Sequence, residues 1–173
     1  MPVLIRRETP ADVAAVRAVT AVAFARAETV EPIEVALLDQ LRSGPAWLPP
    51  LSMVATGTDG AVVGHVVCSR AHVDGAPVVG LGPISVLPGH QRQGVGLALV
   101  HAVLGGADAL GEPLVALLGS PDYYGRYGFR PSTEYGITAP DPTWGRFFQA
   151  RPLAAYQPSL RGAFVYPQAF DLA

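Results

Sequence analysis

Residues 86–96 read Val86-Leu87-Pro88-Gly89-His90-Gln91-Arg92-Gln93-Gly94-Val95-Gly96. The residues before this stretch are strand-like, and Pro88-Gly89 ends the strand. After the turn, apolar residues recur at helical spacing up to Leu104. The first turn of a helix has backbone N–H groups without internal partners and carries the positive end of the helix dipole. Because Gly94 and Gly96 lack a Cβ, an anion can lie directly on these amides, so the stretch predicts phosphate or pyrophosphate binding by the backbone.

The pattern differs from two common phosphate-binding motifs. A Walker loop needs a lysine after its second glycine, and the chain contains no lysine. A Rossmann fingerprint needs a third glycine, whereas Leu97, Ala98 and Leu99 follow Gly96. Glycine-rich turns between a strand and a helix also occur as simple connections, so the motif alone leaves a purely structural role open.

The spacing Gln-x-x-Gly-x-Gly resembles the acyl-coenzyme A loop of the GNAT superfamily of N-acetyltransferases, with Gln91, Gly94 and Gly96 in its fixed positions. The resemblance implies acetyl-CoA as co-substrate. The four histidines do not form a metal set, so no metal is expected. The resemblance also implies that the pyrophosphate lies on the amides of residues 93–96 and the thioester along residues 84–86, where backbone N–H groups polarise the carbonyl oxygen. The implied coenzyme-binding residues are Ile84, Ser85, Val86, Gln91, Arg92, Gln93, Gly94, Val95, Gly96, Gly119, Ser120 and Tyr124.

A second motif lies further along the chain, where Tyr124, Gly128 and Phe129 resemble the GNAT segment Tyr-x-x-x-Gly-Phe. The resemblance implies that Tyr124 is catalytic, as the general acid that protonates the departing thiolate. A phenol with a pKa near 10 is close enough to a thiol, with a pKa of about 8.5, to share or donate a proton. The neighbouring Tyr123 is interpreted as a packing or coenzyme contact. An aromatic anchor for a short helix is the alternative role of Tyr124.

Two features depart from the family pattern. Many GNAT members have an asparagine before the tyrosine, but this chain has no asparagine, and the backbone of Gly119 or Ser120 is the candidate replacement. The strand before the glycine loop carries neither a carboxylate nor a histidine, so no general base is identified there. Water chains, backbone carbonyls or the carboxylates of Glu28, Glu31 and Glu34 remain candidates, although a solvated helix face is the favoured interpretation of these three glutamates.

Local patterns predict the order of the elements. Turn signals at Asp59-Gly60 and Asp74-Gly75 separate three strands, which are expected to form an antiparallel meander. The expected strands are 3–6, 52–56, 61–73, 78–86, 114–118, 146–151 and 161–165, and the expected helices are 10–24, 32–42, 95–110 and 122–127. This order is similar to that of GNAT folds. We therefore expect one α/β (α+β) domain over residues 1–173, with a mixed, mostly antiparallel sheet that is splayed at the acyl-CoA site and flanked by helices.

Composition limits the compartment and the partners. The 173 residues suit one domain, and the net charge of −2 argues against a nucleic-acid or membrane-surface partner. The single cysteine, Cys68, cannot form an internal disulfide. Arg6, Arg7 and Glu8 interrupt the N-terminus before an apolar signal or anchor could form. A cytoplasmic location is the expectation.

These observations favour an acetyl-CoA-dependent N-acetyltransferase that moves the acetyl group, by direct attack, to a primary amine of a small molecule, peptide or protein. A non-catalytic acyl-CoA-binding sensor is the alternative, motivated by the missing base. A translation-blocking toxin that acts on charged tRNA is disfavoured by the net charge of −2. The proline- and aromatic-rich residues 131–167 are compatible with either an acceptor pocket or a homodimer surface.

Overall fold

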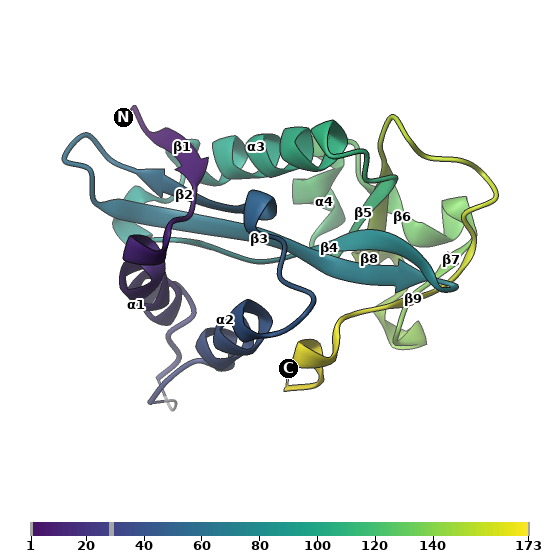
Figure 1. Cartoon of the computed structure of the whole chain (residues 1–173), viewed down its shortest axis with the longest axis horizontal. Helices are drawn as coiled ribbons and strands as arrows, with labels where there is room; N and C mark the ends of the chain where they lie inside the picture. The colour runs from purple at the N-terminus through teal and green to yellow at the C-terminus, as the bar shows by residue number, and fades with distance from the viewer. Residues whose placement is uncertain (1, 28–29, 173) are drawn as a thin grey trace.

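The computed structural model describes residues 2–27 and 30–172, which build one sheet of nine strands (Figure 1). The main path of the sheet is β1-β2-β3-β4-β5-β8-β6, while β9 pairs with β3 and β7 with β9. All pairs are antiparallel except β4–β5 and β7–β9. The strands are β1 Leu4–Arg7, β2 Ser52–Thr56, β3 Val62–Val73, β4 Ala76–Val86, β5 Leu114–Leu118, β6 Arg130–Pro131, β7 Ile137–Thr138, β8 Phe148–Pro152 and β9 Gly162–Val165. The expected mixed, mostly antiparallel sheet is confirmed.

Helices flank the sheet on both sides (Figure 1). Helices α1 (Val13–Ala23) and α2 (Ile33–Ser43) lie on one side, and α3 (Val95–Ala109) and the short α4 (Pro121–Tyr124) lie on the other. A 3-10 turn precedes α1, and its Asp12 carboxylate accepts a hydrogen bond of 2.7 Å from the backbone N–H of Thr9. This is half of a capping box, the signal that a Thr-Pro-Ala-Asp start provides.

The packing follows the helical periodicity of the sequence. Val16 of α1 and Leu38 of α2 pack against Val54 and Val67 of the sheet. The opposite face is covered by the apolar side of α3, whose buried residues are Val95, Leu99, Val100, Val103, Leu104 and Ala107. The sheet is thus a middle layer, and the glycine loop joins it to α3 at one end.

Strands β4 and β5 diverge. They pair only at Val79↔Val115 and Gly80↔Ala116, although β4 continues to Val86. A bulge lies directly after the paired part, where Gly82 and Pro83 of β4 together stand opposite one residue of β3. A bulge bends its strand, and proline has no N–H for a ladder hydrogen bond. The sheet therefore opens between the later parts of β4 and β5, as expected of a splayed sheet.

The C-terminal third is less regular than the rest. The expected strand 146–151 is Phe148–Pro152, because its first two residues belong to a 3-10 turn. The two-residue strands β6 and β7 had no sequence signal. The final 3-10 turn, Gln168–Leu172, lies beside α2 (Figure 1). Within the described residues, no helix has both the length and the apolar character needed to cross a membrane.

Candidate active site

The glycine loop opens a groove at the start of α3. Gly94 is the N-cap of α3 and has a φ of 84°, a left-handed conformation that a residue with a Cβ rarely adopts. Gly94 and Gly96 line a cavity of about 540 Å³, which we call the glycine-loop groove. The first N–H groups of α3 have no partners within the helix and lie at its positive end. The geometry suits an anion held by backbone amides, as expected from the motif.

The two glutamines of the motif brace this loop from within. Gln91 Nε2 donates a hydrogen bond of 3.1 Å to the carbonyl of Val86, at the end of β4. Gln93 Nε2 donates to the carbonyl of Gly89 at 3.3 Å. The side chain of Val95 is buried in the core under α3, so it offers a ligand only its backbone. Gln91 thus lines the groove and also fixes the distance between β4 and the loop.

Two arginines flank the groove. Arg92 lies in the loop with a φ of 60°, which is uncommon for a residue other than glycine. Arg126 follows α4, and its guanidinium lies 4.6 Å from the centre of the Tyr123 ring. Its Nε also donates to the carbonyl of Tyr123 at 3.0 Å. Both cations are exposed and available to phosphate oxygens, and Arg126 was not among the predicted site residues.

The end of β4 forms the inner part of the groove. Ile84 and Val86 line it. Ser85 lies between them and has a buried side chain, because successive residues of a strand point to opposite faces. Among the described residues, the Ser85 hydroxyl has no hydrogen-bond partner. Ser85 can therefore reach a ligand in the groove through its backbone and not through its hydroxyl.

Tyr124 lines the glycine-loop groove. Its ring packs directly on Gly119, where an added Cβ would lie 2.5 Å from Tyr124 Cε2. The backbone of Gly119 is used inside the protein, since its N–H donates to Phe147 and its carbonyl accepts from Gln149. The carbonyl of Ser120 accepts from the N–H of Tyr124 at 2.9 Å. Gly119 and Ser120 therefore support Tyr124 and do not themselves line the groove.

Tyr123, which directly precedes Tyr124, has different surroundings. Its hydroxyl accepts a hydrogen bond of 2.8 Å from the hydroxyl of Tyr127.

The surroundings of these tyrosines shift their pKa values. Burial, together with the neighbouring Tyr123, raises the pKa of Tyr124 to about 12. Burial and the hydrogen bond with Tyr123 also raise the pKa of Tyr127. Tyr124 therefore keeps its phenolic proton over the whole physiological pH range.

A second cavity of about 540 Å³ continues beyond Tyr124, on the side of α2, and we call it the aromatic cavity. It shares Ile84 and Tyr124 with the glycine-loop groove. Its aromatic walls are Phe24, Trp144, Tyr166 and Phe170, three of which come from the C-terminal third that showed no clear periodicity. The bulge residues Gly82 and Pro83 also line it, so the aromatic cavity lies where β4 diverges from β5.

The structure separates the two candidate glutamates that it describes, Glu31 and Glu34. Glu28 lies outside the described residues. The side chain of Glu31 is 55% exposed and lies 3.7 Å from Arg17, as expected of a solvated face. The side chain of Glu34 is only 13% exposed and lines the aromatic cavity. Of the two glutamates that the structure describes, only Glu34 is a site residue by position.

A larger cavity of about 640 Å³ lies between α2 and the C-terminal turn. It shares Tyr166 with the aromatic cavity but shares no described residue with the glycine-loop groove. Size alone therefore does not identify the reacting centre. Among residues 2–27 and 30–172, no group of three or more His, Cys, Asp or Glu side chains is arranged to hold a metal ion.

Comparison with known proteins agrees with this geometry. A family model described as an acetyltransferase (GNAT) domain matches residues 4–132. The uncharacterised N-acetyltransferase YhbS of Escherichia coli K12 is 32% identical over 106 residues, which are 60% of this chain and 64% of that protein. YjhQ, another uncharacterised N-acetyltransferase of that strain, is 35% identical over 99 residues, 54% of each chain. The chain thus matches less than two thirds of the length of these curated relatives.

Solved structures match over nearly the whole chain. The crystal structure of the E. coli GNAT family N-acetyltransferase YhbS in complex with CoA superposes with a TM-score of 0.88 at 29% identity, over 98% of this chain and 92% of that one. A GNAT family acetyltransferase from Brucella melitensis in complex with acetyl-CoA superposes with a TM-score of 0.79 at 34% identity, over 98% and 99%.

Proposed function

The chain belongs to the GNAT family of N-acetyltransferases, and from this premise we propose that it moves the acetyl group of acetyl-CoA to a primary amine by direct attack. The observation that carries the proposal is the meeting of the glycine-loop groove and the aromatic cavity at Ile84 and Tyr124. A groove suited to the coenzyme and a cavity suited to the acceptor are thus lined by the same two residues where they meet. The relatives solved with CoA and acetyl-CoA support this coenzyme.

The residues of the groove fit the coenzyme. The amides at residues 93–96 would hold the diphosphate, because Gly94 and Gly96 leave them uncovered and the dipole of α3 favours negative charge there. Arg92 and Arg126 would bind phosphate oxygens with charge-assisted hydrogen bonds. The backbone of residues 84–86, which has no strand partner on the side of β5 in the described chain, would hold the acyl end.

Acetyl-CoA supplies the acetyl group and a thiolate leaving group. Tyr124 would give its phenolic proton to the thiolate as the carbon–sulfur bond breaks and the carbon–nitrogen bond forms. The dry surroundings that raise the pKa of Tyr124 also raise that of a thiol, which keeps the two groups matched. The N–H groups near Ser85 and Val86 would polarise the carbonyl oxygen. Over the whole reaction, the ammonium form of the acceptor loses two protons. The thiolate gains one of them, and the other is released to solvent.

The test is coenzyme binding together with thiol release. At a hundredfold excess over Kd, acetyl-CoA should stabilise the fold by about 2.7 kcal/mol, which raises Tm by roughly 5–11 °C at this chain length. Acetyl-pantetheine has the thioester but no diphosphate, so it should give a much smaller shift. Release of the CoA thiol should then depend on an added amine. No Tm shift would refute the proposal, and a shift without thiol release for any amine would favour the non-catalytic sensor.

A further inference from the structure

We propose that the aromatic cavity selects a small primary amine carried on an apolar, uncharged body, and that Glu34 binds its ammonium group. This inference rests on the proposed function and narrows the acceptor class. It is drawn from the burial of one carboxylate, the anchoring of the helix that carries it, and the character of the walls around it.

Glu34 lies in the first turn of α2 with one oxygen uncommitted. Oε1 lies 3.4 Å from Nη2 of the exposed Arg26. Oε2 is shielded from solvent, and no described residue donates a hydrogen bond to it. A buried carboxylate oxygen without a hydrogen-bond donor is costly, so Oε2 favours a ligand that brings a positive charge and N–H donors. The N-terminal end of the helix dipole helps to keep the negative charge in place.

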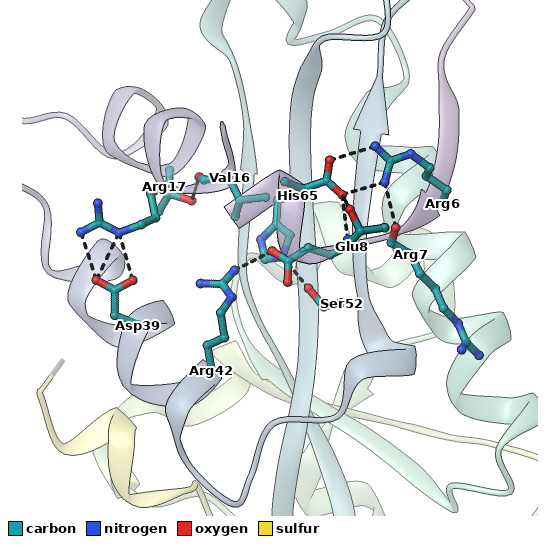
Figure 2. Close-up of polar contacts among 12 residues, drawn as sticks. Arg6, Arg7, Glu8, Val16, Arg17, Asp39, Arg42, Ser52 and His65 are labelled. Atoms are coloured by element: carbon teal, nitrogen blue, oxygen red, sulfur yellow. Dashed lines mark hydrogen bonds and ion pairs between the residues drawn. The ribbon is translucent and has the colours of Figure 1, made fainter. Parts of the chain in front are cut away.

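The helix that carries Glu34 is fixed on two sides (Figure 2). Arg17 of α1 donates to Asp39 of α2 at 3.0 Å, and Arg42 of α2 donates to Glu8 next to β1. Leu37 follows Glu34 one helical turn later and also lines the aromatic cavity. The carboxylate is thus held at the wall of the cavity by a positioned helix rather than by a loop.

The remaining walls are apolar. Glu34 is the only charged side chain among the described residues that line the cavity. Tyr166 and Phe170 form a stacked pair with ring centroids 4.5 Å apart, and Trp144 lies across Tyr166. Such walls favour an apolar or aromatic body and disfavour any second charge, which would have no partner. The volume of about 540 Å³ is that of a small-molecule site.

Binding of 2-phenylethylamine to the CoA-loaded protein, measured by calorimetry, tests the role of Glu34 without relying on turnover. The substitution Glu34→Gln keeps the shape and removes the charge, so it should weaken amine binding about 10- to 100-fold. Binding of the neutral analogue 2-phenylethanol should not change, which separates charge recognition from damage to the cavity. Glu31→Gln, in the same segment but facing Arg17, is the matched control and should leave amine binding unchanged.

Selectivity is tested with three amines in the thiol-release assay. The apolar amine 2-phenylethylamine should be preferred over ethanolamine, which lacks the apolar body, and over phenylalanine, whose added carboxylate faces Glu34. Equal use of the three, or equal amine affinity of wild type and Glu34→Gln, overturns the inference, as does failure of 2-phenylethylamine to bind. Failure of acetyl-CoA to bind would refute the proposed function instead, and the two failures are read from different titrations.

Discussion

Replacing Gly119 by alanine should displace Tyr124 without touching the glycine loop. The added Cβ would lie 2.5 Å from Tyr124 Cε2 and 2.8 Å from Cδ2, whereas ordinary contacts begin at 3.4 Å. Since Gly119 is held by backbone hydrogen bonds to Phe147 and Gln149, the ring has to move, by about 1 Å. A misplacement of about 1 Å near the reacting centre can cost about a hundredfold in rate.

The expected result is therefore a kcat about a hundredfold lower in Gly119→Ala, with a nearly unchanged affinity for acetyl-CoA. Overpacking should also cost about 1–3 kcal/mol of stability, which lowers Tm by roughly 2–12 °C for a chain of this length. The assays are steady-state thiol release well below Tm and a thermal titration with acetyl-CoA.

Gly125 provides the matched control. It lies one residue beyond Tyr124, has an ordinary helical φ of −56°, and a Cβ added there meets nothing within 4 Å. Gly125→Ala should keep kcat and Tm close to wild type. If Gly119→Ala retains kcat to within about threefold, the activity does not depend on the packing of the Tyr124 ring against Gly119, which contradicts the prediction. A loss of kcat that is equally large in a Tyr124→Phe background would show that the displaced phenolic hydroxyl is not the cause.

Three further outcomes follow from the site and the fold. Tyr124→Phe should lower kcat about 10²- to 10⁴-fold with little change in acetyl-CoA affinity, and an unchanged kcat would remove its acid role. Arg126→Ala should weaken the binding of acetyl-CoA about tenfold or more. It should not weaken the binding of acetyl-pantetheine, which has no diphosphate. An equal loss of affinity for both compounds would contradict the phosphate contact. Burial and the charge of Arg42 lower the pKa of His65 to about 3, below its unfolded value of 6.5. The unfolded chain therefore binds this proton first, and the unfolding free energy should fall between pH 6.5 and 3 by up to about 1.4 kcal/mol per pH unit. In urea unfolding experiments on His65→Gln, the unfolding free energy should lack this part of its pH dependence. An identical pH dependence in the variant and the wild type would exclude His65 as its source.

Local signals were sufficient for much of the framework. The Asp74-Gly75 turn places both residues at positive φ, as a tight hairpin requires, and it joins β3 to β4 as predicted. Strands β2 and β5 match their predicted limits, because apolar runs between turn residues are local features. The helix after the glycine loop begins at Val95, directly after the left-handed Gly94.

The structure of the C-terminal third could not be predicted from local signals. Its 3-10 turns and two-residue strands have no periodicity of their own, and they depend on partners far away in the chain. Phe148 and Phe164 meet only because β8 pairs with β5 and β9 with β3. The aromatic cavity is assembled from such distant residues, so no single window of sequence indicated it.

By itself, the sequence determined the glycine loop, the order of the main elements and the tyrosine near the loop, since each is encoded within a few neighbouring residues. Only the tertiary structure decided that β4 bends away from β5 at Gly82-Pro83, that Tyr124 rests on Gly119, and that Glu34 faces a cavity while Glu31 faces solvent. The physical reason is that the direction of a side chain depends on how its helix or strand is packed, and that packing is set by contacts between residues distant in the chain.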